Sequence, residues 1–144
     1  MLVLNGPNLG TLGRREPEVY GTQTLADLEA MLSTRAGELG VELHCLQSNH
    51  EGQLIDAIEK EGAGSDAIII NPGALSHHSL ALADALRGSG KPVIEVHISN
   101  VFAREPQRHH MVTAAAAKAV ISGMGFEGYL SALEHLTHRP QKRS

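Results

Sequence analysis

Tyr20 is one of two tyrosines in this 144-residue chain and stands in a polar segment that also holds Arg14 and Arg15. A phenol normally loses its proton near pH ~10, but nearby cations favour the phenolate and lower that pKa. Tyr20 is therefore either a general base or a tyrosine that covers the rim of the domain. If Arg104 and Arg108 reach the same edge, four arginines there favour an anion-binding site over solvated surface charge.

Glu95 and His97 form a second candidate pair, within the apolar run 93–99 (VIEVHIS). Alternation along a strand puts both side chains on one face, about 7 Å apart along it. A carboxylate there can hold the imidazole in one tautomer and make it a positioned acid or base. The alternative is a buried histidine that is satisfied by hydrogen bonds. The backbone amides of Ile98 and Ser99, which follow, are suited to binding an anion.

A third polar segment, NPGALSHHS, follows the apolar run 67–70 (AIII). Asn71 either binds a substrate hydroxyl or shapes the turn. His77 and His78 diverge by about 100° at the start of a helix, and no nearby carboxylate or cysteine completes a metal site, so we expect no metal. Asp84 lies seven residues beyond His77 and about 10 Å away on the same helix face. It is either a surface acid or part of a neighbouring subunit's site.

The elements that must position these residues alternate between short strands and helices of 3.6-residue period. We expect strands at 1–4, 41–47, 67–70, 93–99 and 119–122, and helices at 24–39, 53–61, 79–87 and 126–137. Thr24 and Asp27 fit a capping box at the first helix. Such alternation implies a parallel sheet with helices on both faces, and ligands then bind beyond the carboxyl ends of the strands. The three polar segments, 5–21, 71–79 and 99–108, follow the first, third and fourth strands.

Composition and charge limit the class of protein. A formal charge of −4 and a pI near 6.1 argue against broad nucleic-acid or membrane binding. The single cysteine, Cys45, cannot form an internal disulfide, and no apolar run reaches membrane-spanning length. We expect one cytoplasmic domain over 1–144, with a frayed tail at 138–144.

Five motifs occur in order along almost the whole chain: LNGPNL, GRREPEVYG, QSNHEG, INPGALSHHS and IEVHISNVFARE. In these motifs the sequence resembles the type II 3-dehydroquinate dehydratase family. The resemblance implies an α/β, flavodoxin-like three-layer sandwich whose five-stranded parallel sheet has the order 2-1-3-4-5. It implies no cofactor and no metal, and a homododecamer. The implied reaction is the dehydration of 3-dehydroquinate to 3-dehydroshikimate by anti elimination through an enolate. This step belongs to the shikimate pathway of aromatic amino-acid biosynthesis and is shared with quinate catabolism.

The resemblance also implies roles for individual residues. Tyr20 would be the base that removes the proton α to the ketone, and Arg15 would lower the pKa of Tyr20. His97, oriented by Glu95, would protonate the departing hydroxyl, and Asn8 would hold a water on the developing enolate. The remaining implied contacts to substrate are Asn71, His77, Arg108 and the amides of Ile98 and Ser99, with Asp84 reaching a neighbouring subunit and Arg104 in a supporting role.

Other classes of protein fit the sequence less well. A non-catalytic flavodoxin-like module that binds a small anion is the alternative, but a receiver-type version would carry acids where Asn5 and Asn71 stand. A hydrolase would need a G-x-S-x-G elbow, which is absent, or an exposed cysteine, whereas Cys45 falls inside an expected strand. A Schiff-base mechanism would need a lysine in the polar segments, and the lysines lie elsewhere: Lys60, Lys91, Lys118 and Lys142.

Overall fold

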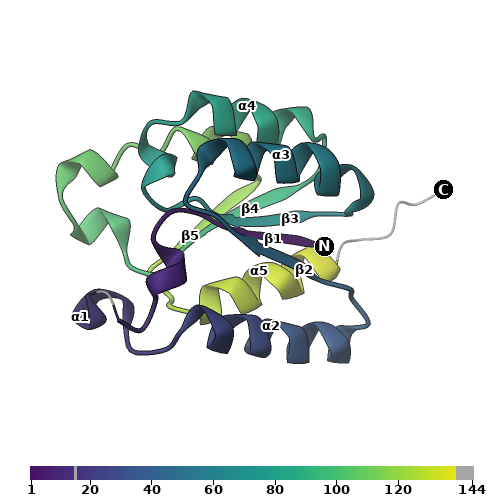
Figure 1. Cartoon of the computed structure of the whole chain (residues 1–144), viewed down its shortest axis with the longest axis horizontal. Coiled ribbons are helices and arrows are strands. Elements are labelled where there is room, and N and C mark those ends of the chain that lie inside the picture. The colour runs from purple at the N-terminus through teal and green to yellow at the C-terminus, as the bar shows by residue number, and fades with distance from the viewer. Residues whose placement is uncertain (15, 139–144) are drawn as a thin grey trace.

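The computed structural model describes residues 1–14 and 16–138, apart from the side chains of Val19 and Tyr20. Its centre is one parallel sheet with the strand order β2-β1-β3-β4-β5, which confirms the predicted flavodoxin-like arrangement (Figure 1). The strands are β1 (Leu2–Asn5), β2 (His44–Gln47), β3 (Ile68–Asn71), β4 (Val93–His97) and β5 (Ala119–Ser122). The predicted start of the second strand at 41 was wrong, because the ladder between β1 and β2 begins where Leu2 pairs with His44.

Helices cover both faces of the sheet (Figure 1). One face carries α2 (Leu25–Leu39) and α5 (Glu127–Thr137), and the other carries α3 (Glu51–Glu61) and α4 (Leu80–Gly88). The short helix α1 is Pro17–Tyr20, and single 3-10 turns are η1 (Leu9–Thr11), η2 (Gly62–Gly64), η3 (Gly73–His77), η4 (Val101–Ala103), η5 (Pro106–Arg108) and η6 (Thr113–Ala116). Of the tail predicted at 138–144, only His138 is described; it ends α5.

The helix ends follow from local side chains. The Thr24 hydroxyl accepts a hydrogen bond from the Asp27 amide, and the Asp27 carboxylate accepts one from the Thr24 amide, so the predicted capping box at α2 is confirmed. Gly40 ends the same helix with φ of 71°, a backbone conformation that costs glycine little. No helix in the described part of the chain is both long and apolar enough to cross a bilayer.

Alternation along the strands builds two apolar cores, one on each side of the sheet. Leu2, Leu4 and Val93 pack with α3 and α4, whereas Val3 and Val96 pack with α2 and α5. Every residue of β1, β3 and β4 is buried, because both faces of these central strands are covered.

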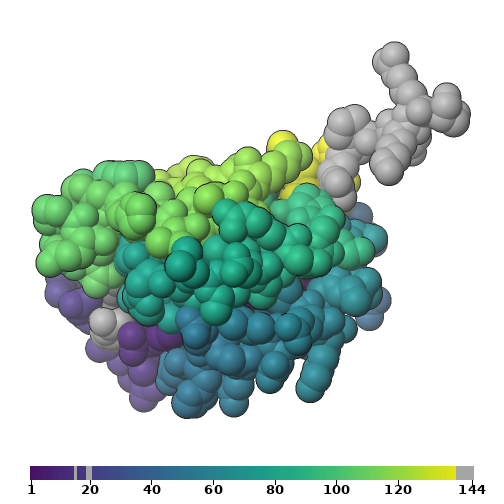
Figure 2. Space-filling view, turned by 90° about the horizontal axis from the view of Figure 1, so that it is seen from above, coloured from purple at the N-terminus to yellow at the C-terminus, as the bar shows by residue number. Residues whose placement is uncertain are grey.

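The turns that follow β1 and β3 lie at the same edge of the sheet and contact each other. The Gly6 amide donates to the Asn71 carbonyl at 2.8 Å. A Cβ atom at Gly6 would lie 2.6 Å from the Pro72 carbonyl oxygen, so only glycine fits this approach. Beyond β4, the segment 100–118 returns alongside α4, as the view onto this face shows (Figure 2). The three polar segments predicted to meet at this edge therefore do meet.

Candidate active site

A buried acid–base pair stands at the end of β4. Glu95 is fully buried and His97 is 6% exposed. The His97 Nε2 atom lies 2.6 Å from the Glu95 Oε2 atom, which confirms the predicted same-face arrangement. A carboxylate accepts hydrogen bonds, so Nε2 of His97 is the donor and Nδ1 is the nitrogen left for a ligand.

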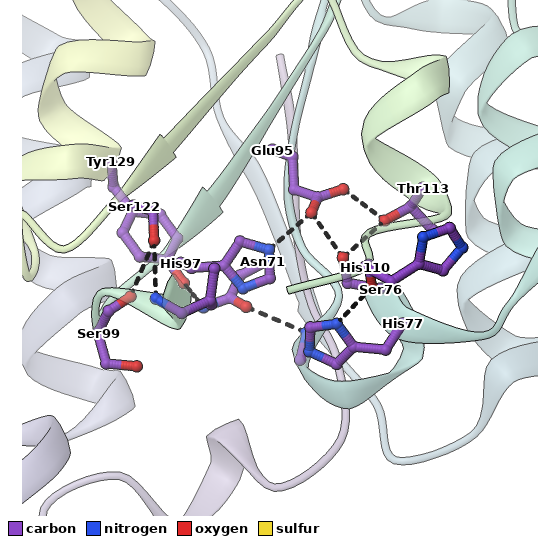
Figure 3. Close-up of polar contacts among 12 residues, drawn as sticks. Asn71, Ser76, His77, Glu95, His97, Ser99, His110, Thr113, Ser122 and Tyr129 are labelled. Carbon is purple, nitrogen blue, oxygen red and sulfur yellow. Dashed lines mark hydrogen bonds and ion pairs between the residues drawn. The ribbon is translucent and has the colours of Figure 1, made fainter. Parts of the chain in front are cut away.

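Two hydroxyls complete the surroundings of Glu95 (Figure 3). Ser76 in η3 donates to Oε2 at 2.8 Å, and Thr113 in η6 donates to Oε1. Burial alone would raise the pKa of Glu95, but the hydrogen bonds from His97, Thr113 and Ser76 together hold it below its ordinary value. Glu95 is therefore a buried carboxylate that keeps its charge. Sequence reasoning missed both hydroxyls.

His77 lies beside this pair with a defined proton position. Its Nδ1 atom lies 3.0 Å from the His110 carbonyl oxygen, which can only accept, so Nδ1 carries the proton. Burial lowers the pKa of His77, and the charges of His97 and Arg108 lower it further against the effect of that hydrogen bond. A neutral His77 then presents Nε2 as an acceptor. Its ring stacks against that of His97, with 6.3 Å between the centroids.

Asn71 is held by Tyr129 of α5, on the face of the sheet opposite to Glu95. Its Oδ1 accepts from the Gly73 amide at 3.1 Å, so Asn71 does shape this turn, while the other alternative, binding of a substrate hydroxyl, stays a prediction. Its Nδ2 donates to the Tyr129 hydroxyl at 2.8 Å, and that hydroxyl donates to Asn5 Oδ1 at 2.7 Å. The second N–H of the Asn71 amide remains for a ligand. The helical pattern predicted that Tyr129 points inward but gave no sign of this polar contact.

Asn8 sits in the turn after β1 with φ of 71°, a left-handed conformation that asparagine tolerates well. The backbone N–H of Asn8 donates to the Asn49 side chain at 3.0 Å, and the backbone carbonyl of Asn8 accepts from the Thr11 hydroxyl at 2.8 Å. These two bonds fix the turn on both sides of Asn8. The asparagine is therefore placed by the backbone at the edge of the sheet.

A cavity of about 630 Å³, including its open mouth, lies over these residues. The predicted residues that line it together with His97 are Asn8, Asn71, His77, Ile98, Ser99, Arg104 and Arg108. Its apolar walls, Pro7, Leu9, Leu12 and Val101, were not predicted, because nothing local distinguishes them from ordinary core residues.

Two arginines bring positive charge to this cavity. Arg104 is mostly buried and approaches Glu16 at 3.9 Å, and Glu16 begins the short helix α1. Arg108 forms an ion pair with Glu105 three residues earlier. Two of the four arginines expected at this edge therefore line the cavity, and Arg104 ties the segment before α1 to the loop after β4. That they bind an anion stays a prediction.

Two predicted residues that the structure describes are not among the cavity's walls: Glu95, which holds His97, and Asp84. Asp84 is exposed on α4, 3.5 Å from Arg87, and borders a separate groove between α3 and α4. Arg15 and the side chain of Tyr20 lie outside the described residues, so their roles remain predictions. No group of three or more metal-binding side chains is found where the structure is described, and the expected absence of a cofactor remains a prediction.

Comparison with known proteins decides the family. The pattern of the family described as "Dehydroquinase class II" matches residues 1–137. This chain belongs to the class II dehydroquinase family. It is similar to the 3-dehydroquinate dehydratase of Roseiflexus castenholzii, with 57% identity over 136 residues that cover 94% of this chain and 87% of the relative.

Other class II dehydroquinase relatives extend the comparison. Catabolic 3-dehydroquinase 2 of Aspergillus flavus is 55% identical over 135 residues, which cover 94% of this chain and 90% of the relative. The crystal structure of type II dehydroquinase from Propionibacterium acnes superposes with a TM-score of 0.93 at 46% identity and covers 96% of both chains. The fold, like the sequence, is that of this family from β1 to α5.

Proposed function

We propose that this chain is a 3-dehydroquinate dehydratase, a lyase of the shikimate pathway that forms 3-dehydroshikimate without a Schiff base. Membership of the class II dehydroquinase family supports the proposal. The structural observation that carries it is the buried His97–Glu95 pair at the wall of a cavity that two arginines also line. Such a pair supplies a positioned proton donor next to a site for an anionic substrate.

The elimination needs a base at one carbon and an acid at the departing oxygen. We assign the base to Tyr20, helped by Arg15: it removes the proton α to the ketone, and the electron pair of the C–H bond forms an enolate. The enolate then expels the hydroxyl, whose C–O electron pair leaves with the oxygen. A His97 that carries a proton on both nitrogens keeps Nε2–H on Glu95 and gives its Nδ1 proton to that oxygen, so water departs and the ring gains a conjugated double bond. Asn8 holds the water that stabilises the enolate.

The rest of the cavity is assigned to substrate recognition. The substrate carboxylate meets the backbone amides of Ile98 and Ser99 and the charge of Arg108, with Arg104 in support. His77 accepts a hydrogen bond from a substrate hydroxyl through Nε2, because its Nδ1 proton is bound to a carbonyl. Asn71 donates its second amide N–H to another hydroxyl.

We further propose a cytoplasmic homo-oligomer, a homododecamer, in which Asp84 reaches a neighbouring subunit's site. The Asp84 side chain is 76% exposed in the single chain, on the α4 surface beside the groove with α3. Sedimentation velocity tests the assembly, and a monomer at assay concentrations would refute it. Mixing Asp84→Ala protein with His97→Ala protein tests the shared site, because mixed oligomers then contain some sites with neither change and regain turnover.

The primary test is the ultraviolet absorbance of the conjugated enone after 3-dehydroquinate is added. We expect a rise that persists after borohydride treatment, since no lysine Schiff base takes part. A folded, oligomeric sample that gives no rise would favour the small-anion-binding module instead.

Variants test the acid and the base. Tyr20→Phe and His97→Ala are each expected to lower kcat by a factor of about 10²–10⁴ while leaving the circular dichroism spectrum unchanged. His44→Ala is the matched control, because His44 is an exposed histidine on β2 that lies 3.7 Å from Glu61 and outside the cavity. Near-normal turnover in Tyr20→Phe or His97→Ala would refute the corresponding assignment.

A further inference from the structure

The Glu95 carboxylate has a donor on each oxygen, and only one of the three donors is the proposed acid. His97 and Ser76 donate to Oε2, and Thr113 donates to Oε1. All three donors are buried, and Ser76, Thr113 and Glu95 have no exposed surface. Both oxygens of the carboxylate are therefore hydrogen-bonded and buried, without contact to solvent in the part of the chain that the structure describes.

Each of the two hydroxyls has its nearest hydrogen-bond partner in this carboxylate. A serine or threonine hydroxyl has a single proton. The Ser76 and Thr113 hydroxyl oxygens also lie 3.2 Å apart, but each makes its shorter contact with its own oxygen of Glu95, Ser76 with Oε2 and Thr113 with Oε1. The two hydroxyls therefore hold the carboxylate at both of its oxygens, and we call Ser76 and Thr113 together the hydroxyl fork.

The backbone brings this fork together from two distant segments. The Val112 amide donates to the Ser76 carbonyl at 2.6 Å, and the His110 carbonyl accepts from His77. These bonds join η3 to the residues that lead into η6, and the side chains of Ser76 and Thr113 lie on either side of this junction with Glu95 (Figure 3). Thr113 is thus positioned by its own backbone connection and not by Glu95 alone.

We propose that Ser76 and Thr113 are positioning residues for the dehydration: they fix the plane of the Glu95 carboxylate and thereby aim Nδ1 of His97 at the substrate. This inference rests on the proposed function. The last torsion of a glutamate side chain has a broad energy profile, so a carboxylate with His97 as its sole partner would turn and carry the imidazole with it. A donor on each oxygen removes that freedom.

The charge state of the carboxylate agrees with this geometry. Burial would raise the pKa of Glu95, and the hydrogen bonds from His97, Thr113 and Ser76 lower it by more. On β4 the titratable group that acts on Glu95 is His97. From η3 the titratable neighbour is His77, whose pKa the charge of Arg108 also lowers. Removing a hydroxyl therefore both frees the carboxylate and raises its pKa.

The test compares hydroxyl removal with hydroxyl retention. Thr113→Val removes the hydroxyl at nearly constant volume, Ser76→Ala removes the other, and Thr113→Ser keeps a hydroxyl at the same position. Thr137→Val is the matched control, because the Thr137 hydroxyl bonds the Leu133 carbonyl within α5, away from the cavity. Each protein is assayed for kcat and KM, and the carboxyl C=O band of Glu95 is titrated by infrared difference spectroscopy against Glu95→Gln.

We expect Thr113→Val and Ser76→Ala to lower kcat about tenfold at nearly constant KM, since a small misplacement of a catalytic group has such an effect. The Glu95 midpoint should rise by about one pH unit, the size expected for one lost hydrogen bond to a charged group. Thr113→Ser should restore both quantities, and Thr137→Val should change neither.

Two results would overturn the inference. One is Thr113→Val with unchanged kcat and an unchanged Glu95 midpoint. The other is Thr113→Ser as impaired as Thr113→Val, because the methyl group and not the hydroxyl would then matter. A wild-type protein without turnover would refute the proposed dehydratase instead, and the infrared titration would still decide whether the two hydroxyls govern Glu95.

Discussion

Replacing Tyr129 with phenylalanine removes one oxygen atom from the centre of the molecule. The Tyr129 side chain is fully buried on α5, and its hydroxyl links Asn71 Nδ2 to Asn5 Oδ1 across β1 and β3. Burial raises the pKa of Tyr129 well above its ordinary value, so the hydroxyl is neutral and serves as both donor and acceptor. Phenylalanine keeps the ring in the core and deletes that link.

The cost of this change follows from what the two amides lose. Asn5 is fully buried and Asn71 is 3% exposed, so water cannot replace the missing oxygen without rearrangement. An orphaned buried polar group costs about 1–3 kcal/mol, and two are created, so we expect a loss of about 2–6 kcal/mol in the free energy of unfolding. Asn5 Nδ2 already has no hydrogen-bond partner among the described residues, which leaves this amide little means of compensation.

Urea unfolding at one fixed protein concentration measures the loss, because oligomers change apparent stability with concentration. Tyr20→Phe is the matched control: it deletes the same atom from α1 and should lower kcat by about 10²–10⁴ without changing stability. In Tyr129→Phe the Asn71 side chain keeps its bond from the Gly73 amide but Nδ2 loses its partner, so KM should rise more than kcat falls. An unfolding free energy within about 0.5 kcal/mol of wild type, the range of neutral surface changes, would refute the reasoning.

Three further predictions concern other parts of the fold. Gly6→Ala should lower both stability and turnover, because the new Cβ atom would meet the Pro72 carbonyl oxygen at 2.6 Å; wild-type kinetics would contradict this. The pKa of Glu95 lies below its ordinary value of 4.5, so the stability it contributes is present above that pH and lost as the pH falls further. The difference in unfolding free energy between wild type and Glu95→Gln, measured by urea unfolding, should therefore become smaller as the pH falls. A difference that stays constant with pH would contradict this prediction. Thr24→Ala should destabilise α2 by about 1 kcal/mol in urea unfolding, whereas Thr34→Ala, whose hydroxyl bonds the Ala30 carbonyl on the same helix, should have a smaller effect.

The sequence predicts those parts of the site that depend on local periodicity. Alternation in a strand is strict, so the shared face of Glu95 and His97 follows from their spacing alone. The meeting of three loops at one edge follows from the parallel sheet, whose strands all end there. The capping box at Thr24 is equally local, since its two partners are three residues apart.

Contacts between distant segments could not be predicted in this way. Ser76 and Thr113 are 37 residues apart and meet only because η6 folds back over η3. The sequence around η6 is a run of alanines without period, so it gave no helix and no direction for Thr113. For Tyr129 the helical pattern gave the buried face, but a pattern of burial does not say which polar atom a hydroxyl will meet.

The sheet passes through the middle of the site, and its two faces belong to different cores. Glu95 and its two hydroxyls lie on the side of α4, whereas Asn71 and Asn5 are held from the side of α5 through Tyr129. Changes on the two sides share no hydrogen-bond partner within the protein, so their effects on the free energy of unfolding should add in a double-mutant cycle. Selection or design can then retune substrate recognition by altering α5 while the proton donor on the other layer stays intact.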